Sequence, residues 1–462
     1  MNKHHLEADE HTSIAYWDEN NLYGGALRQA LPCGDFKWVE PKYYEKIDWL
    51  NIDTEGNTGY VLKVDLSYPP EIHDKTQDFP LAPEPASVTR DMFTPFMEQQ
   101  WQEKRRLRNV NNKFVPCKKL LMTCRDKTEY VVHYKLLKFY LKMGLIITKI
   151  HNVIQFTQRP IFRDYIDSNS AKRQQTSCEF TKDLFKLLNN ALFGKTMENV
   201  RGRKDFKLTN SREKFEALAM KPQFRNCHAF SDELALTELL KLEVLLDRPI
   251  FIGQAVLDLS KLTMYKLRYE QLPSYEEEFQ GRICVLGGDT DSLICSVHNI
   301  NLVELHRSML RDGLLDTSNY PTNHPLFTEN FKAKLGCIKD EVEGERIEEA
   351  VLLKPKCYSL LTNTLKTCKK TAKGVQRCVR TAISHQEYKN VYLHNMQVSK
   401  NMRRFQSKDH VVYTIQQNKW ALSVADDKRA WVSKNKSLPF GHYGLATEFE
   451  PSTPKRPRLE CQ

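Results

Sequence analysis

The hydrophobic pattern near the N-terminus predicts a strand, a polar turn and a helix. Residues 14–25 read IAYWDENNLYGG, an apolar and aromatic run that breaks at Gly24 and Gly25 before ALRQAL resumes a helical pattern. Residues 59–68 alternate well enough to predict a second strand. The Pro-rich stretch 69–85 is expected to be irregular, because proline lacks the backbone donor that helices and sheets use.

Helical and strand patterns alternate in the rest of the chain. Residues 92–150 show a basic and helical pattern in which Gly144 is expected to stop a helix, and residues 177–200 predict a second helical block. Residues 282–297, RICVLGGDTDSLICSV, are an apolar strand, a tight Gly/Asp turn and another apolar strand, which is typical of a β-hairpin. Residues 346–361 and 410–424 predict strands and short helices. The mixture predicts an α+β fold.

Composition places few limits on this picture. A length of 462 residues allows two to four domains. Lys and Arg total 69 against 58 Asp and Glu, and the net charge of +11 favours a polyanionic partner, although a solvated basic surface explains it equally well. The 12 cysteines show neither CxxC pairs nor zinc-like spacing, which predicts reduced thiols.

The chain shows no targeting segment that would direct it to a membrane. No apolar run approaches the ~18 residues that span a bilayer, and the start has no signal-peptide pattern. We therefore expect an intracellular protein of the nucleus or cytoplasm without a membrane partner. Residues 447–462 predict a disordered basic tail, in which Lys455, Arg456 and Arg458 resemble a nuclear-localisation signal.

The candidate chemistry lies in three carboxylates. Asp289 and Asp291 are two residues apart in the predicted hairpin, so both can project toward one site if the chain there stays extended. A hard divalent cation such as Mg²⁺ keeps such a pair ionised. Two-metal nucleotidyl transfer needs more carboxylate ligands than one hairpin easily supplies. Asp18, which ends the first predicted strand, could be the third. The alternative is that these residues cap ordinary turns.

A helical stripe could supply groups for an anionic substrate. Lys186, Asn190 and Phe193 fall at i, i+4 and i+7 on one helix face, and Lys182 extends the stripe. A lysine there can meet phosphates as a point charge, and an aromatic ring can pack against a base or sugar. The alternative is an amphipathic helix whose core positions are Leu184, Leu187, Leu188 and Leu192.

In their order along the chain, these motifs resemble those of family B DNA polymerases. DENNLYG at 18–24 resembles the family's DxxSLYP, KLLNNALFG at 186–194 resembles KxxxNSxYG, GGDTDS at 287–292 resembles YxDTDS, and KCY at 356–358 resembles KxY. The resemblance extends from about Ile14 to Tyr443 and is to the protein-primed branch found in bacteriophages, adenoviruses, linear plasmids and self-synthesising transposons.

The resemblance implies a role for each matching residue. Asp18 and Asp291 would be the direct ligands of two Mg²⁺ ions, and Asp289 would assist them. Tyr23 would be the steric gate that excludes a 2′-hydroxyl. The remaining residues would bind the substrates: Lys186 and Lys182 the triphosphate, Asn190 and Phe193 the nascent base pair, and Lys356 and Tyr358 the primer terminus.

The implied activity is that of a DNA-directed DNA polymerase acting on primer-template DNA and deoxynucleoside triphosphates, with a terminal protein as a further expected partner. Basic stretches such as 104–108, 369–373 and 403–404 would neutralise DNA phosphates. The family's N-terminal exonuclease motifs have no counterpart here, so we expect synthesis without proofreading. Gly287, Ala191, Phe193, Asn21 and Gly24 depart from the family pattern.

The same resemblance predicts a right-hand fold with an antiparallel β-sheet palm, helical fingers and a small thumb. The expected divisions are 1–50 for the first part of the palm, 51–176 for an insertion like the terminal-protein region, 177–205 for the fingers, 206–345 for the second part of the palm, 346–446 for the thumb and 447–462 for the tail.

Two other functions remain open. One is a catalytically silent nucleic-acid-binding remnant of a viral or transposon polymerase. The other is a reverse transcriptase, which the spacing of Asp289 and Asp291 and the aromatic residue Tyr23 disfavour, because reverse transcriptases typically carry adjacent aspartates.

Overall fold

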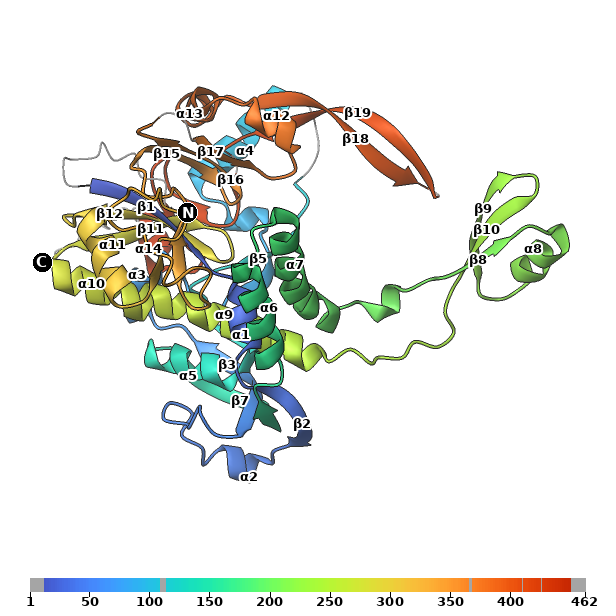
Figure 1. The fold of residues 1–462 in the computed structure, drawn as a ribbon, viewed down its shortest axis with the longest axis horizontal. Helices are drawn as coiled ribbons and strands as arrows, with labels where there is room; N and C mark the ends of the chain where they lie inside the picture. Colours follow the sequence, from blue (N-terminus) through green and yellow to red (C-terminus); the bar gives the residue numbers. More distant parts are fainter. Residues whose placement is uncertain (1–11, 109–113, 365–367, 409, 425, 450–462) are drawn as a thin grey trace, which may run out of the picture.

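A five-stranded sheet organises the computed structural model, which describes residues 12–108, 114–364, 368–408, 410–424 and 426–449 (Figure 1). Its strands in spatial order are β11 (Arg282–Gly288), β12 (Ser292–His298), β1 (Thr12–Glu19), β14 (Ile338–Asp340) and β13 (Leu315–Asp316). All neighbours are antiparallel except β13 and β14, which are parallel. The hairpin predicted at 282–297 and the strand predicted from residue 14 are confirmed.

Alternation along β1 separates two hydrophobic cores. Ala15 and Trp17 pack on one face with α9 (Ile250–Lys266) and α11 (Leu302–Arg311), whereas Tyr16 packs on the other face with Ile294. Because alternate side chains of a strand project to opposite faces, Asp18 shares the face of Tyr16. The helical elements are α9 (Ile250–Lys266), the π-helical η4 (Leu267–Gln271), α10 (Leu272–Phe279) and α11 (Leu302–Arg311).

A three-stranded antiparallel sheet covers the face of the central sheet that carries Tyr16. Its strands are β15 (Ile347–Lys354), β16 (Cys357–Thr362) and β17 (Cys368–Ala372). Leu352, Tyr358 and Leu360 of this sheet share a buried cluster with Tyr16 and Ile294. This packing brings the β15–β16 turn close to the end of β1.

A four-stranded antiparallel sheet packs against α9 and forms the largest core. Its order is β2 (Leu31–Trp38), β7 (Ile146–Arg159), β3 (Thr58–Ser67) and β6 (Lys127–His133), and α5 (Tyr134–Lys142) packs beside it. The prediction of strand at 59–68 is confirmed. The helical pattern of 92–150 is wrong at β6, because this strand pairs with β3 and fully buries Val132, and at the start of β7, which also pairs with β3. The helix stop expected at Gly144 is confirmed, since α5 ends at Lys142 and Gly144 has a φ of +106°.

Strand pairing and packing connect segments that belong to different expected divisions. Residues 31–38, in the expected division 1–50, pair with β7, in the expected insertion 51–176. The C-terminal residues Trp431 and Phe440 pack with Met97 of the same insertion. The elements of that contact are β4 (Glu84–Ser87), α4 (Pro95–Arg108), β5 (Lys118–Leu121), β20 (Ala430–Trp431) and β21 (Ser437–Leu438).

Two extended arms leave the body, and the tip of one approaches the near end of the other (Figure 1). One arm is the hairpin of β18 (Val398–Lys408) and β19 (Val411–Leu422), and the other is a small three-stranded sheet with one helix. The second arm begins the predicted palm division 206–345 but pairs with none of the strands of the central sheet. Its elements are β8 (Asp205–Thr209), α8 (Arg212–Ala219), β9 (Phe224–Ser231) and β10 (Leu234–Leu239).

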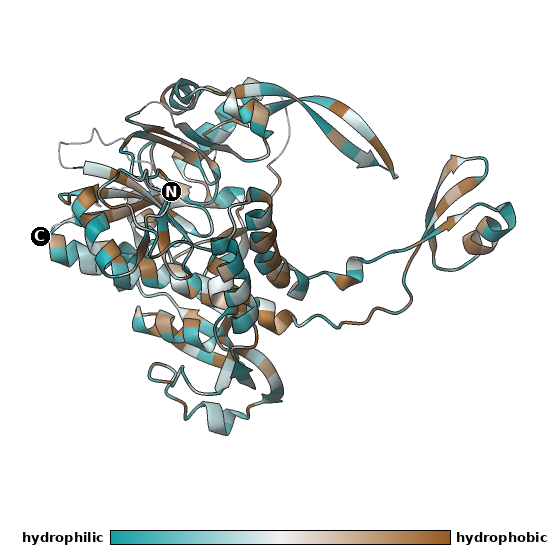
Figure 2. Cartoon of the chain, in the orientation of Figure 1, coloured by the Kyte–Doolittle hydropathy of each residue, from teal (hydrophilic) through white to brown (hydrophobic). Residues whose placement is uncertain are grey.

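Contacts of one histidine join the two arms. The ring of His410, at the hairpin tip, lies edge-on to Phe206 with the centroids 5.2 Å apart. Its Nε2 is 4.0 Å from Oε2 of Glu238. Figure 2 shows apolar residues along the second arm, and Leu208 and Phe230 there are 61% and 49% exposed. The second arm therefore has little core of its own.

The remaining elements are short, apart from three helices. They are α1 (Leu22–Leu27), α2 (Pro41–Tyr44), η1 (Pro70–Ile72), α3 (His73–Thr76), η2 (Arg90–Met92), α6 (Arg163–Gln175), α7 (Glu179–Thr196), η3 (Val200–Gly202), α12 (Arg377–Thr381), α13 (His385–His394) and α14 (Tyr443–Phe449). Within the described ranges, none of the helices has the length and apolar character needed to cross a membrane. Lys455, Arg456 and Arg458 lie outside the described residues.

Stability below neutral pH is expected to depend on His133. This side chain is fully buried, its ring nitrogens have no partner among the described residues, and burial lowers its pKa to about 3. The unfolded chain takes up this proton near pH 6.5, so folding should lose about 1.4 kcal/mol per pH unit between pH 6.5 and about 3. Urea unfolding of His133→Leu at several pH values should lack this component, and parallel pH profiles for both proteins would contradict the prediction.

Candidate active site

The end of β1 and the β11–β12 turn bring two carboxylates together. Asp18 lies opposite Ser292 in the antiparallel register, and the backbone N–H of Glu19 donates to the carbonyl of Asp291 at 2.7 Å. Within the turn, Thr290 adopts a left-handed φ of +64°, and the N–H of Asp289 donates a hydrogen bond to Oγ of Ser292 at 3.2 Å. Pairing of distant strands therefore places Asp18 beside the DTDS turn.

The turn after Asp18 is set by one asparagine. Asn21 adopts a left-handed φ of 54°, and its side-chain oxygen accepts the N–H of Gly24 at 3.3 Å. A Cβ on Gly24 would lie 2.2 Å from Nδ2 of Asn21, so this position favours glycine. Helix α1 begins at Leu22, and the predicted break at Gly24 and Gly25 is wrong because this asparagine cap starts the helix before them.

The carboxylates interact electrostatically. Burial and then the negative charge of Asp291 raise the pKa of Asp18 to about 7, while the ammonium groups of Lys369 and Lys186 act in the opposite direction. Burial also raises the pKa of Asp291, with a further contribution from Asp289, and Lys186 again opposes the shift. A site that raises the pKa of both acids is one that favours the arrival of positive charge.

Two charged groups of this site were not predicted as site residues. Glu19 is buried, and its pKa is raised to about 8, first by burial and then by Asp18. Lys369 is an ion-pair partner of Glu341, and its ammonium lies 4.8 Å from the ring centroid of Tyr16. The only signal in the sequence was the position of Glu19 next to Asp18 and of Lys369 in a basic stretch.

Asp289 already has a cationic partner. Its Oδ1 lies 2.9 Å from Nζ of Lys356, which belongs to the β15–β16 turn and has a φ of +60°. The lysine predicted to bind the primer, Lys356, thus forms an ion pair with Asp289, the carboxylate predicted to assist the metal ligands. Asp289 is consequently less available than Asp18 and Asp291 for a cation.

Tyr358 lies beneath the site. Only 6% of it is exposed, and its hydroxyl is 2.8 Å from the hydroxyl of Tyr16. The rings are edge-to-face with centroids 6.0 Å apart. Tyr358 therefore supports β1 from below, through Tyr16, instead of presenting its hydroxyl at the surface.

Helix α7 supplies an aromatic ring and a lysine. Phe193 stacks on Tyr23 of α1 with a centroid distance of 4.6 Å and an interplanar angle of 23°. Burial and then the charge of Asp291 raise the pKa of Tyr23, which places this tyrosine beside the carboxylates. Lys186 is exposed on the same helix, and its positive charge opposes the rise in the pKa of both Asp18 and Asp291.

Other predicted residues of α7 do not join this group. Nζ of Lys182 lies 2.6 Å from Oε1 of Glu179 on its own helix, and Asn190 is exposed. The neighbouring Asn189 is the buried one, and its Oδ1 accepts from Asn169 at 2.9 Å. The alternative of an ordinary amphipathic helix also fails in part, because 40% of Leu184 and 62% of Leu187 are exposed.

The residues present fit Mg²⁺ that arrives with a substrate. Within the described part of the chain, no three or more His, Cys, Asp or Glu side chains converge as a ready-made metal cage. Mg²⁺ is commonly held by one or two protein carboxylates, completed by water and substrate phosphates. Asp18 and Asp291 provide such a pair, whose mutual repulsion a cation would relieve.

Comparison with known proteins gives no match to a family model and none to a curated protein. Among solved structures, the fold is similar to Phi29 DNA polymerase complexed with primer-template DNA and incoming nucleotide substrates, with a TM-score of 0.48 and 12% identity. The match covers 91% of this chain and 61% of the other. An orthorhombic crystal form of Phi29 DNA polymerase gives 0.48 and 13% with the same coverage. The chain thus spans about three fifths of that polymerase.

Proposed function

We propose that this chain is a DNA-directed DNA polymerase, which adds deoxynucleotides to a primer 3′ end by metal-assisted nucleotidyl transfer. The observation that supports the proposal is the convergence of Asp18, at the end of β1, and Asp291, in the distant β11–β12 turn, with the ammonium group of Lys186 opposing the rise in pKa of both carboxyl groups. The stacked pair of Tyr23 and Phe193 adds a flat apolar surface beside the acids. These are the groups that a triphosphate bearing a base and sugar requires.

Each side chain has a task in this reaction. Two Mg²⁺ ions, when bound, would activate the primer 3′-oxygen and stabilise the departing pyrophosphate. Asp18 and Asp291 would hold these ions, which relieves the repulsion between the two carboxylates. Lys186 would meet the triphosphate oxygens as a point charge. Tyr23 and Phe193 would position the sugar and base, and Lys356, which pairs with Asp289, would be the group that contacts the primer terminus.

Primer extension tests the proposal directly. The protein is incubated with a primed DNA template, Mg²⁺ and one deoxynucleotide at a time, and the complementary nucleotide alone should lengthen the primer. Binding of the same DNA is measured in parallel at two salt concentrations, because phosphate contacts weaken with salt. Salt-sensitive binding without any extension would replace the proposal with the silent, nucleic-acid-binding alternative.

Tyr23→Ala is expected to increase ribonucleotide incorporation at least about tenfold relative to deoxynucleotide incorporation. The ring lies against Phe193, near Asp291, where it can occupy the space that a 2′-hydroxyl needs. The ratio of kcat/KM for the two nucleotides is the measurement. Tyr23→Phe keeps the ring and serves as the control, which should discriminate like the wild type. Unchanged discrimination in Tyr23→Ala would remove this role.

His410→Ala is expected to shorten the product made in one binding event several-fold. His410 joins the two arms through its contacts with Phe206 and Glu238. Arms in contact can hinder the dissociation of a bound DNA strand. The product length is read with excess unlabelled primed DNA present as a trap. His394→Ala, which removes an exposed histidine of α13, is the matched control. Equal lengths for all three proteins would contradict the role of the arms.

A further inference from the structure

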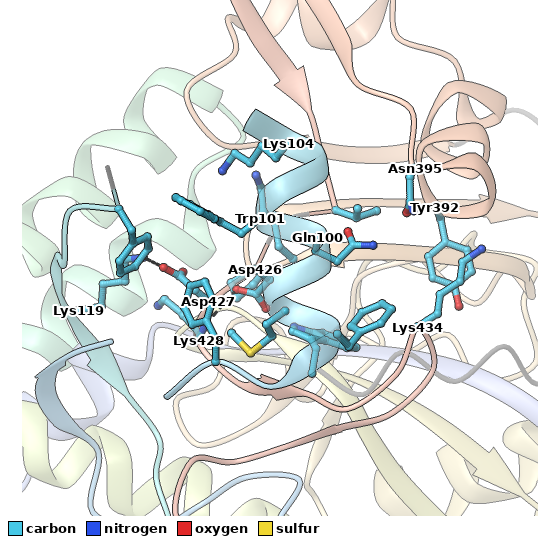
Figure 3. A pocket seen from close by; sticks show the side chains of 18 of the residues that line it. Gln100, Trp101, Lys104, Lys119, Tyr392, Asn395, Asp426, Asp427, Lys428 and Lys434 are labelled. Carbon is cyan, nitrogen blue, oxygen red and sulfur yellow. Dashed lines mark hydrogen bonds and ion pairs between the residues drawn. The ribbon is translucent and has the colours of Figure 1, made fainter. Parts of the chain in front are cut away.

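A cavity of about 470 Å³ lies next to the candidate active site, between α4, the β15–β16 turn and the C-terminal loop that contains Asp426. Figure 3 shows Gln100, Trp101 and Lys104 of α4 on one side and Tyr392 and Lys434 on the other. Lys356 lines this cavity and also contacts Asp289, so the cavity and the carboxylates share one residue. Its volume lies within the roughly 300–1,000 Å³ typical of small-molecule sites.

The wall of the cavity is rich in flat rings. Phe93, Phe96 and Trp101 come from α4 and the turn before it, Phe114 precedes β5, and Tyr392 comes from α13. All five are partly exposed. The guanidinium groups of Arg90 and Arg105 lie over the ring of Trp101, at 4.3 and 4.8 Å from its centroid, and Nζ of Lys434 lies 5.1 Å from the centroid of Tyr392. Aromatic faces of this kind bind nucleobases by stacking, without selecting one base strongly over another.

The same wall is strongly basic. Seven lysines line it, against only two acids, Asp426 and Asp427. Asp427 pairs with Lys119, and Nζ of Lys354 donates to Ser423 at 3.0 Å.

Two of these lysines are available to a ligand. The ammonium groups of Lys373 and Lys428 have no partner among the described residues, although both residues line the cavity. They arise from different segments, Lys373 just after β17 and Lys428 in the C-terminal loop. A cavity with free ammonium groups from separate segments is suited to an anion.

We propose that this cavity binds one unpaired nucleotide, with the base stacked on the ring of Tyr392 and the phosphate on Lys373 and Lys428. An acidic peptide would meet the lysines but leave the rings unused, and an apolar ligand would leave the lysines unused. A nucleotide uses both. The site is distinct from the Asp18 and Asp291 pair and does not require that pair to be catalytic.

Fluorescence of 2-aminopurine tests the proposal with the full-length chain. One probe is 2-aminopurine deoxyriboside 5′-monophosphate, and the other is a short duplex ending in a single unpaired 2-aminopurine nucleotide. Stacking on the rings should quench the fluorescence of a bound probe. Lys373→Ala/Lys428→Ala should weaken the binding about tenfold or more. Tyr392→Leu should reduce the quenching at saturation.

The controls separate this site from general charge effects. Lys37→Ala/Lys46→Ala removes two exposed lysines far from the cavity in sequence, and should bind both probes like the wild type. Quenching of both probes indicates a site for free nucleotides, and quenching of the duplex alone indicates a site for a strand end. Absence of quenching with either probe would overturn the proposal. So would equal weakening by the two double variants, or binding of a Glu-rich peptide in place of both probes. Primer extension is not involved, so failure of catalysis leaves this test intact.

Discussion

Asp291→Asn should lower nucleotide incorporation about a thousandfold. The substitution keeps the shape of the side chain and removes one of the two carboxylates that the metals would need. Metal ions contribute several kcal/mol to transition-state stabilisation, and each 1.4 kcal/mol corresponds to a tenfold change in rate. The measurement is single-turnover extension of a primed template at saturating deoxynucleotide, with Asp18→Asn expected to behave in the same way.

Two comparisons make this result interpretable. Asp232→Asn removes an exposed carboxylate in the turn between β9 and β10 and should extend the primer like the wild type. Asp289→Asn should cause a smaller loss than Asp291→Asn, because Asp289 is already paired with Lys356. Equal extension by wild type and Asp291→Asn would end the catalytic assignment. A loss of DNA binding as large as the loss of extension would also contradict a role in the chemical step.

Gly288→Ala should abolish most of the activity and lower the melting temperature. A Cβ at this position would lie 2.1 Å from the carbonyl oxygen of Ser292 on the neighbouring strand. A backbone atom cannot move aside as a flexible side chain can, so the turn that carries Asp289 and Asp291 must shift. Shifts of about 1 Å at a catalytic group typically cost about a hundredfold in rate. Extension assays and thermal unfolding by circular dichroism measure the two effects.

Gly34→Ala is the matched control for this substitution. Gly34 also lies in a strand, but a Cβ there meets no atom within 4 Å. This variant should keep the activity and the melting temperature of the wild type. Activity retained in Gly288→Ala would show that the turn tolerates the displacement, and the proposed dependence of the site on this glycine would be wrong.

The local elements that carry the candidate site were predictable from short patterns. The apolar run before Asp18 predicted a strand, and two apolar runs around a Gly/Asp turn predicted the hairpin of β11 and β12. Residues 177–200 predicted α7, which spans Glu179–Thr196. These predictions succeeded because hydrophobic periodicity and turn chemistry act over a few neighbouring residues.

Longer-range structure was not predictable in this way. Residues 127–133 looked helical beside their basic neighbours, yet they form β6 because β3 provides a pairing partner and a buried face. No short pattern predicted the strands of residues 205–239, where three strands pair with each other and with none of the strands of the central sheet. Pairing partners distant in the sequence decide such segments, and local propensity yields to them.

The sequence alone named Asp18, Asp289 and Asp291 as candidate carboxylates, because residue type and spacing are local properties. Only the tertiary structure separated them. Antiparallel pairing of β1 with β12 set Asp18 beside Asp291. Packing of the β15–β16 turn brought Lys356 into an ion pair with Asp289. Burial then raised the pKa of Asp18 and of Asp291. Burial and charge proximity are sums over distant parts of the chain, so they arise only when the chain has folded.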